Sequence, residues 1–186
     1  MRDLAARWEH DVIAERPDWL AVKIGINDVW RTVAGRLAEA VPLDEYELTY
    51  RRLLERTQSA TAARLILLEP YVIAPPVTGD PTALTGLTLA QVQQVYPRLR
   101  ERGETSGAQF EAAMAHFRAL MDQYVAAVHR LAAAYDAVLV RTQAAFDAAI
   151  EGQPPAFWAA DRVHAGAAGH AVIARAFLRA VGYGDV

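Results

Sequence analysis

The sequence of 186 residues contains no cysteine, which excludes disulfide bonds, thiolate metal sites and a cysteine nucleophile. It also lacks any apolar run of membrane-spanning length, because Arg and Asp interrupt each one. The charged start, Met1–Leu4, does not resemble a secretory signal. These absences predict a cytoplasmic domain that does not enter membranes.

Several polar residue types are almost missing. Asn27 is the only asparagine, Lys23 the only lysine, and Ser59 and Ser106 are the only serines. A mechanism that uses an asparagine or a serine side chain therefore has very few residues to choose from. The formal net charge is −3 and basic residues form no cluster, so nothing indicates binding to nucleic acid or to an anionic membrane surface.

The length suits one domain spanning residues 1–186, and 53% hydrophobic residues are enough for a single core. Short apolar runs at 19–24, 64–69 and 137–140 are typical of buried parallel strands. Helices are predicted at 2–15, 43–60, 87–102, 110–131, 143–150 and 166–181. The Pro-, Gly- and Thr-rich residues 71–86 indicate an irregular surface loop, and the helix at 87–102 is polar enough to lie outside the core.

Strands that alternate with helices predict an α/β fold, in which helices cover both faces of a parallel sheet. Three strands are few for this architecture, and the chain opens on a helix with no strand before it. We therefore expect the sheet to be incomplete at its N-terminal side.

The polar loop Gly25–Asp28 directly follows the first predicted strand, which is where open parallel sheets bind ligands. A glycine lets the backbone approach a substrate, and the Asn27 carboxamide can donate a hydrogen bond to a developing oxyanion. The alternative is structural: Gly25 only makes the turn, and Asn27 or Asp28 caps the next segment of the chain.

A second polar element, Asp161-Arg162-Val163-His164, precedes the final predicted helix. A carboxylate three residues before a histidine can fix the imidazole tautomer and stabilise the imidazolium that forms on proton uptake. The alternative is that Asp161 caps a helix and His164 is a surface residue.

The other histidines have weaker claims to chemistry. His170 lies inside the final helix, His116 and His129 are expected on the solvent side of the long helix, and His10 lies on the opening helix. None is paired with carboxylates in a pattern that indicates a metal site. The Trp and Phe residues are expected in the core.

The segment from Val22 to Arg31, which contains Gly25-Ile26-Asn27-Asp28, is similar to the GxND segment of SGNH/GDSL-type hydrolases. Asp161-Arg162-Val163-His164 resembles their DxxH segment, and Glu69-Pro70 falls between the two in the family's order. The similarity covers nearly the whole chain except residues 75–113, which we expect to be an insertion. The chain thus resembles the C-terminal two-thirds of such a hydrolase.

The resemblance implies a flavodoxin-like three-layer α/β/α fold and hydrolysis of a small-molecule ester without a cofactor or metal. It also implies roles for four residues. His164 would be the general base, Asp161 would orient it, and the Asn27 side chain would donate to the oxyanion, while Gly25 shapes the loop. Ala165 replaces the proline that relatives usually have after the histidine.

The family's nucleophilic serine, in a GDS segment after the first strand, has no counterpart here. Neither Ser59 nor Ser106 follows a sharp strand-to-helix turn. Three interpretations stay open: an ester hydrolase whose start lies further upstream, a catalytically inactive fragment that binds a ligand or a partner, and a fragment with no function of its own. We expect an upstream extension that encodes the serine. The sequence does not identify the ester, and an exposed sheet edge would favour a homo-oligomer.

Overall fold

The computed structural model describes residues 1–184, and its centre is a parallel sheet of three strands, β1 (Trp19–Val22), β2 (Arg64–Leu68) and β3 (Val138–Val140). Their order is β1-β2-β3, so the strands follow one another in space as they do in sequence. Trp19 pairs with Arg64 at the start of β1, and Ile66 pairs with Val138 at the start of β3. All three predicted strands are confirmed.

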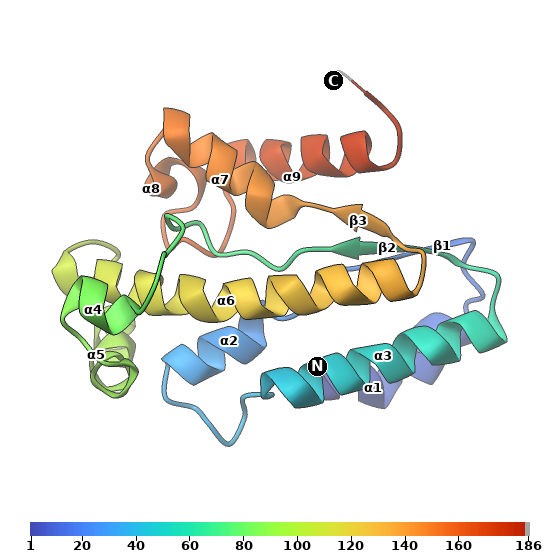
Figure 1. Cartoon of the computed structure of the whole chain (residues 1–186), viewed down its shortest axis with the longest axis horizontal. Helices are drawn as coiled ribbons and strands as arrows, with labels where there is room; N and C mark the ends of the chain where they lie inside the picture. The colour runs from blue at the N-terminus through green and yellow to red at the C-terminus, as the bar shows by residue number, and fades with distance from the viewer. Residues whose placement is uncertain (185–186) are drawn as a thin grey trace.

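Helices cover both faces of this sheet (Figure 1). The lower layer in this view contains α1, α2, α3 and α6, and the upper layer contains α7 and α9. The predicted α/β/α arrangement is therefore confirmed. The helices are α1 (Arg2–Trp8), a π-helical turn (Glu9–Ile13), α2 (Ile26–Val33), α3 (Leu43–Ala60), α4 (Pro81–Thr85), α5 (Leu89–Glu101), α6 (Ala108–Ala134), α7 (Thr142–Gly152), α8 (Pro155–Trp158) and α9 (Ala167–Ala180).

Side chains of β2 alternate between the two faces of the sheet, as the pleat requires. Leu65 and Leu67 belong to the main hydrophobic core, which α3 and α6 cover. Ile66 and Leu68 belong to a smaller cluster on the opposite face, packed against Phe177 of α9. A strand buried on both faces reads as a continuous apolar run, which is why it could be recognised from the sequence.

The segment after β2 corrects the sequence prediction. Residues 71–74 are buried and do not form a surface loop. Their backbone groups bond to distant residues: Val72 N–H donates to Gln143 Oε1 (3.0 Å) and Ile73 N–H donates to the Arg162 carbonyl (2.8 Å). The prediction was wrong because these partners lie far along the sequence, where no local pattern reveals them.

Two other local predictions were wrong. Residues 26–28 form the first turn of α2 instead of a loop. The α5 helix does not lie outside the core, because Val92, Tyr96 and Leu99 are all buried in it. These apolar residues recur every three or four positions, so α5 has a buried stripe despite its polar composition.

Two histidines of α6 also correct the prediction that they face solvent. His116 is buried, and its Nε2 lies 2.7 Å from the Leu87 carbonyl oxygen. His129 Nε2 lies 2.5 Å from Oε1 of Glu69, a buried carboxylate at the end of β2. The other oxygen of Glu69 accepts the Gln143 N–H at 2.8 Å, so this side chain joins β2, α6 and α7. A long helix packed on a sheet thus brings some polar side chains into contact with buried groups, in addition to its apolar stripe.

None of the helices in residues 1–184 combines the length and the apolar character needed to cross a membrane.

Candidate active site

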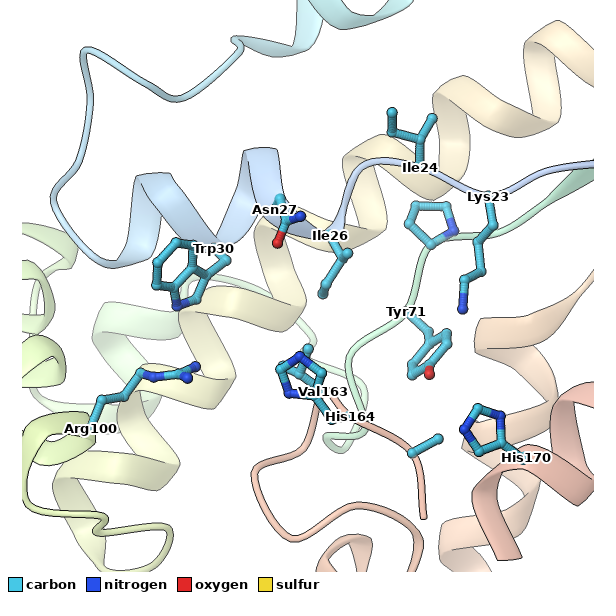
Figure 2. A pocket seen from close by; sticks show the side chains of 12 residues that line it. Lys23, Ile24, Ile26, Asn27, Trp30, Tyr71, Arg100, Val163, His164 and His170 are labelled. Carbon is cyan, nitrogen blue, oxygen red and sulfur yellow. The ribbon is translucent and has the colours of Figure 1, made fainter. Parts of the chain in front are cut away.

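A cavity of about 450 Å³ opens beyond the carboxyl ends of β1 and β2 (Figure 2). Its walls come from the segment after β1, the start of α2, the segment after β2, the loop before α9 and the last turn of α5. Asn27 and His164, which are 137 positions apart in the numbering, both line it. The fold thus brings the two predicted elements to one place.

Asp161 holds His164 through both of its carboxylate oxygens. Oδ2 lies 2.6 Å from His164 Nδ1, and Oδ1 accepts the N–H groups of His164 (2.8 Å) and Val163 (3.1 Å). Burial opposes ionisation of Asp161, but these hydrogen bonds outweigh it and leave the pKa of the carboxyl below its usual value. The carboxylate is therefore ionised at neutral pH and favours the tautomer with the proton on Nδ1.

That tautomer leaves His164 Nε2 as a hydrogen-bond acceptor and proton acceptor. The side chain of His164 is 77% exposed, so Nε2 is accessible from the cavity. Within residues 1–184 no group is bonded to this nitrogen. The geometry is that of an oriented imidazole base.

Arg162, between the aspartate and the histidine, connects this loop to α6. It has a positive φ of 67° and a buried side chain, whose Nη2 donates to Glu111 Oε1 at 2.7 Å. Its guanidinium also lies 5.8 Å from the centre of the Phe110 ring. This role could not be predicted from the sequence, since an arginine in a loop gives no sign of being buried.

The loop is also fixed to α9. Gly166 N–H donates to the Trp158 carbonyl at 2.8 Å. A Cβ at Gly169 would lie only 2.7 Å from the same carbonyl oxygen, so this helical position needs a glycine. The start of α9 is thereby packed directly against the segment that leads to His164.

Gly25 determines where α2 begins. Its φ of 126° favours glycine, and a Cβ there would meet Pro70 and the Tyr46 hydroxyl at 3.3–3.4 Å. The Gly25 carbonyl accepts the Asp28 and Val29 N–H groups, both at 3.1 Å. Gly25 is buried and does not line the cavity, so it contributes through backbone conformation.

Asn27 lies in the first turn of α2, and its side chain is exposed to the cavity. Figure 2 shows its carboxamide extending from α2 on the same side as Trp30. Asn27 has no side-chain hydrogen bond to any residue in the described range, and it does not cap α2. Its amide is therefore available to a ligand.

Two cations, Lys23 and Arg100, line the cavity, and neither was predicted as a site residue. The Lys23 ammonium lies 4.7 Å from the centre of the Tyr71 ring. Surrounding atoms desolvate the ammonium and lower its pKa, although the rest of the side chain stays accessible. Arg100, in the last turn of α5, places its guanidinium 5.6 Å from the centre of the Trp30 ring.

Trp30 itself corrects the expectation that the tryptophans are core residues, because it lines the cavity. It lies three positions after Asn27 on α2, a spacing that puts two side chains on one helix face. That spacing was the signal in the sequence that could have revealed it.

Neither serine lies in the cavity. Ser59 is near the end of α3, where its Oγ donates to the Arg56 carbonyl at 2.9 Å, and it lines a different pocket with Arg16 and Thr61. Ser106 is exposed in the segment between α5 and α6. Within residues 1–184 the cavity lining contains no serine or threonine, and its tyrosine, Tyr71, has a pKa raised by burial.

His170 lines the cavity from α9, whereas His10 is exposed on the π-helical turn. Among residues 1–184 there is no group of three or more His, Cys, Asp or Glu side chains that could hold a metal ion.

A profile of the GDSL-like Lipase/Acylhydrolase family matches residues 1–117. The sequence is 37% identical over 185 residues to an acetylxylan esterase of Geobacillus stearothermophilus, with 98% of this chain and 68% of that protein covered. The match thus leaves about a third of that protein without a counterpart here.

Solved structures of related enzymes also match this chain. The crystal structure of Axe2, an acetylxylan esterase from Geobacillus stearothermophilus, matches with a TM-score of 0.74 at 37% identity, over 97% of this chain and 67% of that chain. LAE5, an alpha/beta hydrolase enzyme from the metagenome of Lake Arreo, Spain, matches with a TM-score of 0.73 at 35% identity, over 100% of this chain and 69% of that chain.

Three further structures of Axe2 are catalytic mutants, in which a serine, an aspartate or a histidine is replaced by alanine. The aspartate and the histidine of those mutants have the same spacing as Asp161 and His164.

Proposed function

Because this chain belongs to the GDSL-like lipase/acylhydrolase family and is an ester hydrolase of the GDSL/SGNH type, we propose that the cavity between Asn27 and His164 is its ester-binding site. The observation that carries the proposal is the 2.6 Å contact between Asp161 Oδ2 and His164 Nδ1, at the cavity that the free Asn27 carboxamide also lines.

His164 is the proposed general base. It takes the proton of a serine hydroxyl through Nε2 while the serine oxygen attacks the ester carbonyl. The imidazolium then gives this proton to the oxygen of the leaving alcohol. Asp161 stabilises the imidazolium and keeps the ring in place. A second cycle, with water in place of the serine, releases the acid.

Asn27 is the proposed oxyanion donor. In this role its carboxamide donates an N–H hydrogen bond to the carbonyl oxygen as negative charge develops there. Gly25 serves this role indirectly, since its positive φ sets the start of α2 and hence the place of Asn27.

The nucleophile comes, in this proposal, from outside residues 1–184, because neither serine of the chain lines the cavity. β1 is an edge strand of the described sheet, and a groove lined by Leu20, Val22 and Asn27 runs along it. A further strand paired in parallel with β1 would end beside Asn27, as the carboxyl ends of parallel strands meet at one edge. The chain by itself would then bind and polarise an ester with little or no turnover.

We propose O-acetyl groups on a carbohydrate as the substrate. The support is the similarity to an acetylxylan esterase, together with a cavity large enough for a sugar beside the acetyl group. We further propose that residues 1–186 form one domain, in which residues 75–113 are an insertion that contributes Arg100 to the cavity.

The test is a fusion protein in which the serine-bearing segment of the Geobacillus esterase precedes residue 1. We expect this fusion to release acetate from acetylated xylo-oligosaccharides and to react with a fluorophosphonate probe at that serine. The unfused chain should do neither. A folded fusion that stays inactive and unlabelled contradicts the proposal, and stoichiometric labelling of Ser106 in the unfused chain would identify a different nucleophile.

A further inference from the structure

The charges around the proposed ester site are unbalanced. Lys23 and Arg100 line the cavity, and neither has a carboxylate partner in the described part of the chain. Most other arginines do: Arg2, Arg56, Arg118, Arg130 and Arg162 all form ion pairs with Asp or Glu. Lys23 and Arg100 are thus two cations without a carboxylate partner in the described residues that line the same cavity, where a ligand is expected.

No acidic side chain of residues 1–184 lines this cavity. Asp161, the carboxylate that orients His164, does not line the cavity, and both of its oxygens are hydrogen-bonded to His164. Two lining cations beside this one carboxylate leave an excess of positive charge around the cavity, and such an excess attracts anionic ligands.

Arg100 is exposed but has two aromatic neighbours. Its guanidinium lies against the Trp30 ring, and Tyr96, one turn earlier on α5, is close enough for the guanidinium to oppose the rise that burial causes in the pKa of Tyr96. The guanidinium can contact a carboxylate through two of its N–H groups.

A general preference for cations at a helix C-terminus does not by itself place Arg100 at the cavity. Arg98 also lies in the last turn of α5 and is exposed, but it does not line the cavity. In Figure 2, Arg100 extends from α5 toward the part of the cavity where Trp30 and His164 lie, while Lys23 lies on the other side of His164, beside Tyr71.

We propose that Arg100 is a specificity-determining residue that binds a carboxylate on the substrate, and that the substrate class is an acetyl ester of an acidic sugar, a uronic acid. Lys23 adds to the positive potential of the same cavity. This inference rests on the proposed ester hydrolase function and extends it. It also gives residues 75–113 a role, since α5 belongs to that segment.

The experiment measures binding, so it does not depend on the nucleophile. Calorimetry compares two ligands for the unfused chain: methyl glucuronoside and methyl glucoside, each acetylated at the same hydroxyl. They differ only at C6, which is a carboxylate in the glucuronoside and a hydroxymethyl group in the glucoside. We expect the glucuronoside to bind about tenfold more tightly at low salt, since one charge-assisted hydrogen-bonded pair has roughly this effect, and the difference to shrink as salt is added.

Three variants assign the preference to particular residues. Arg100→Gln should remove most of the tenfold difference without weakening binding of the neutral ester. Lys23→Gln should reduce the difference about two- to threefold, because it acts through potential alone. Arg98→Gln, on the same helix, should leave both affinities unchanged. If Arg100→Gln does not give the circular dichroism of a folded chain, Arg100→Lys tests the same point with the charge kept, and should retain part of the preference.

Equal binding of the two ligands would overturn this inference and leave the proposed function intact. A loss of affinity for both ligands in Arg100→Gln would also overturn it, because Arg100 would then act on the ester or the sugar ring. A third ligand, methyl glucoside esterified with succinic acid, has its carboxylate on the acyl side. If it alone binds tightly, the substrate class is wrong. If no ligand binds, both proposals fail.

Discussion

The two walls that face each other across the cavity differ in how their polar groups are used. In the histidine loop (residues 159–166) the polar groups are bonded within the protein: Asp161 accepts three hydrogen bonds from the loop itself, and the Arg162 carbonyl accepts a fourth from Ile73 outside it. On the α2 wall (residues 25–30), the Asn27 carboxamide has no partner within residues 1–184.

The two walls have different roles in the proposed reaction. A base must keep its orientation through a proton transfer, so the histidine loop uses its polar groups to fix His164. An oxyanion donor must keep a free N–H until charge develops, and within residues 1–184 the α2 wall positions Asn27 without a hydrogen bond to its carboxamide. Substitutions in the histidine loop should therefore affect both stability and chemistry, whereas Asn27 should affect chemistry alone.

The largest effect is expected for His164→Ala in the serine-bearing fusion protein. Without the base, the serine proton has no acceptor, and we expect acetate release to fall by about 10⁴-fold or more. Initial rates on acetylated xylo-oligosaccharides measure this. His10→Ala is the matched control, because His10 is exposed on the π-helical turn and does not line the cavity. A His164→Ala protein with full activity would remove His164 from the mechanism.

Asn27→Ala should lower the turnover number of the same fusion by about 10²–10³-fold, the usual effect of losing one oxyanion donor. The free energy of unfolding should stay within about 0.5 kcal/mol of the parent, because an exposed side chain without intramolecular partners is removed. Urea titration measures the stability. A large destabilisation with normal turnover would show that Asn27 serves the fold, and the contrast between the two walls would then disappear.

Much of the fold could be predicted from the sequence because its signals are local. The strands are short apolar runs between turn residues, and the stripe of Phe110, Met114, Phe117 and Met121 marks α6 without ambiguity. The burial of residues 71–74 could not be predicted. It depends on Gln143, Arg162 and Arg118, which reach this segment only after the chain has folded.

The residues of the candidate site also differ in whether the sequence alone identifies them. Asn27, Asp161 and His164 were found because each belongs to a short motif with a recognisable order. Lys23 and Arg100 belong to no motif, and their meaning comes from facing one cavity without a carboxylate partner in the described residues. Such a property exists only in three dimensions, because α5 and β1 are far apart in sequence.

Arg162→Ala tests whether the histidine loop is held from outside. The substitution removes the ion pair with Glu111 and the contact with the Phe110 ring. Because Glu111 is partly exposed, solvent weakens this ion pair. We therefore expect the free energy of unfolding to fall by about 1–2 kcal/mol. Urea titration of the unfused chain measures it. Arg98→Ala, an exposed arginine of α5, should change stability by less than about 0.5 kcal/mol. Equal effects of the two substitutions would show that Arg162 does not anchor the loop.

The smallest effect concerns the charge of Asp161. Asp161→Asn keeps an oxygen that can accept the Val163 and His164 N–H groups but removes the charge that faces His164 Nδ1. Because the pKa of Asp161 is lower in the folded chain than in the unfolded chain, ionisation stabilises the fold. This contribution is fully present above the unfolded pKa of about 3.9 and is lost as the pH falls through the folded pKa.

We therefore expect Asp161→Asn to lower the free energy of unfolding by up to about 1 kcal/mol at pH ~7, since the pair is partly exposed. The difference from the parent should begin to shrink as the pH falls below about 4 and disappear below the folded pKa of Asp161, where both proteins carry a neutral side chain at this position. Urea titrations across this range measure the difference. Asp18→Asn, in the turn before β1, provides the control, with no such convergence expected. A difference that stays constant with pH would mean that the carboxylate acts on the loop through geometry and not through its charge.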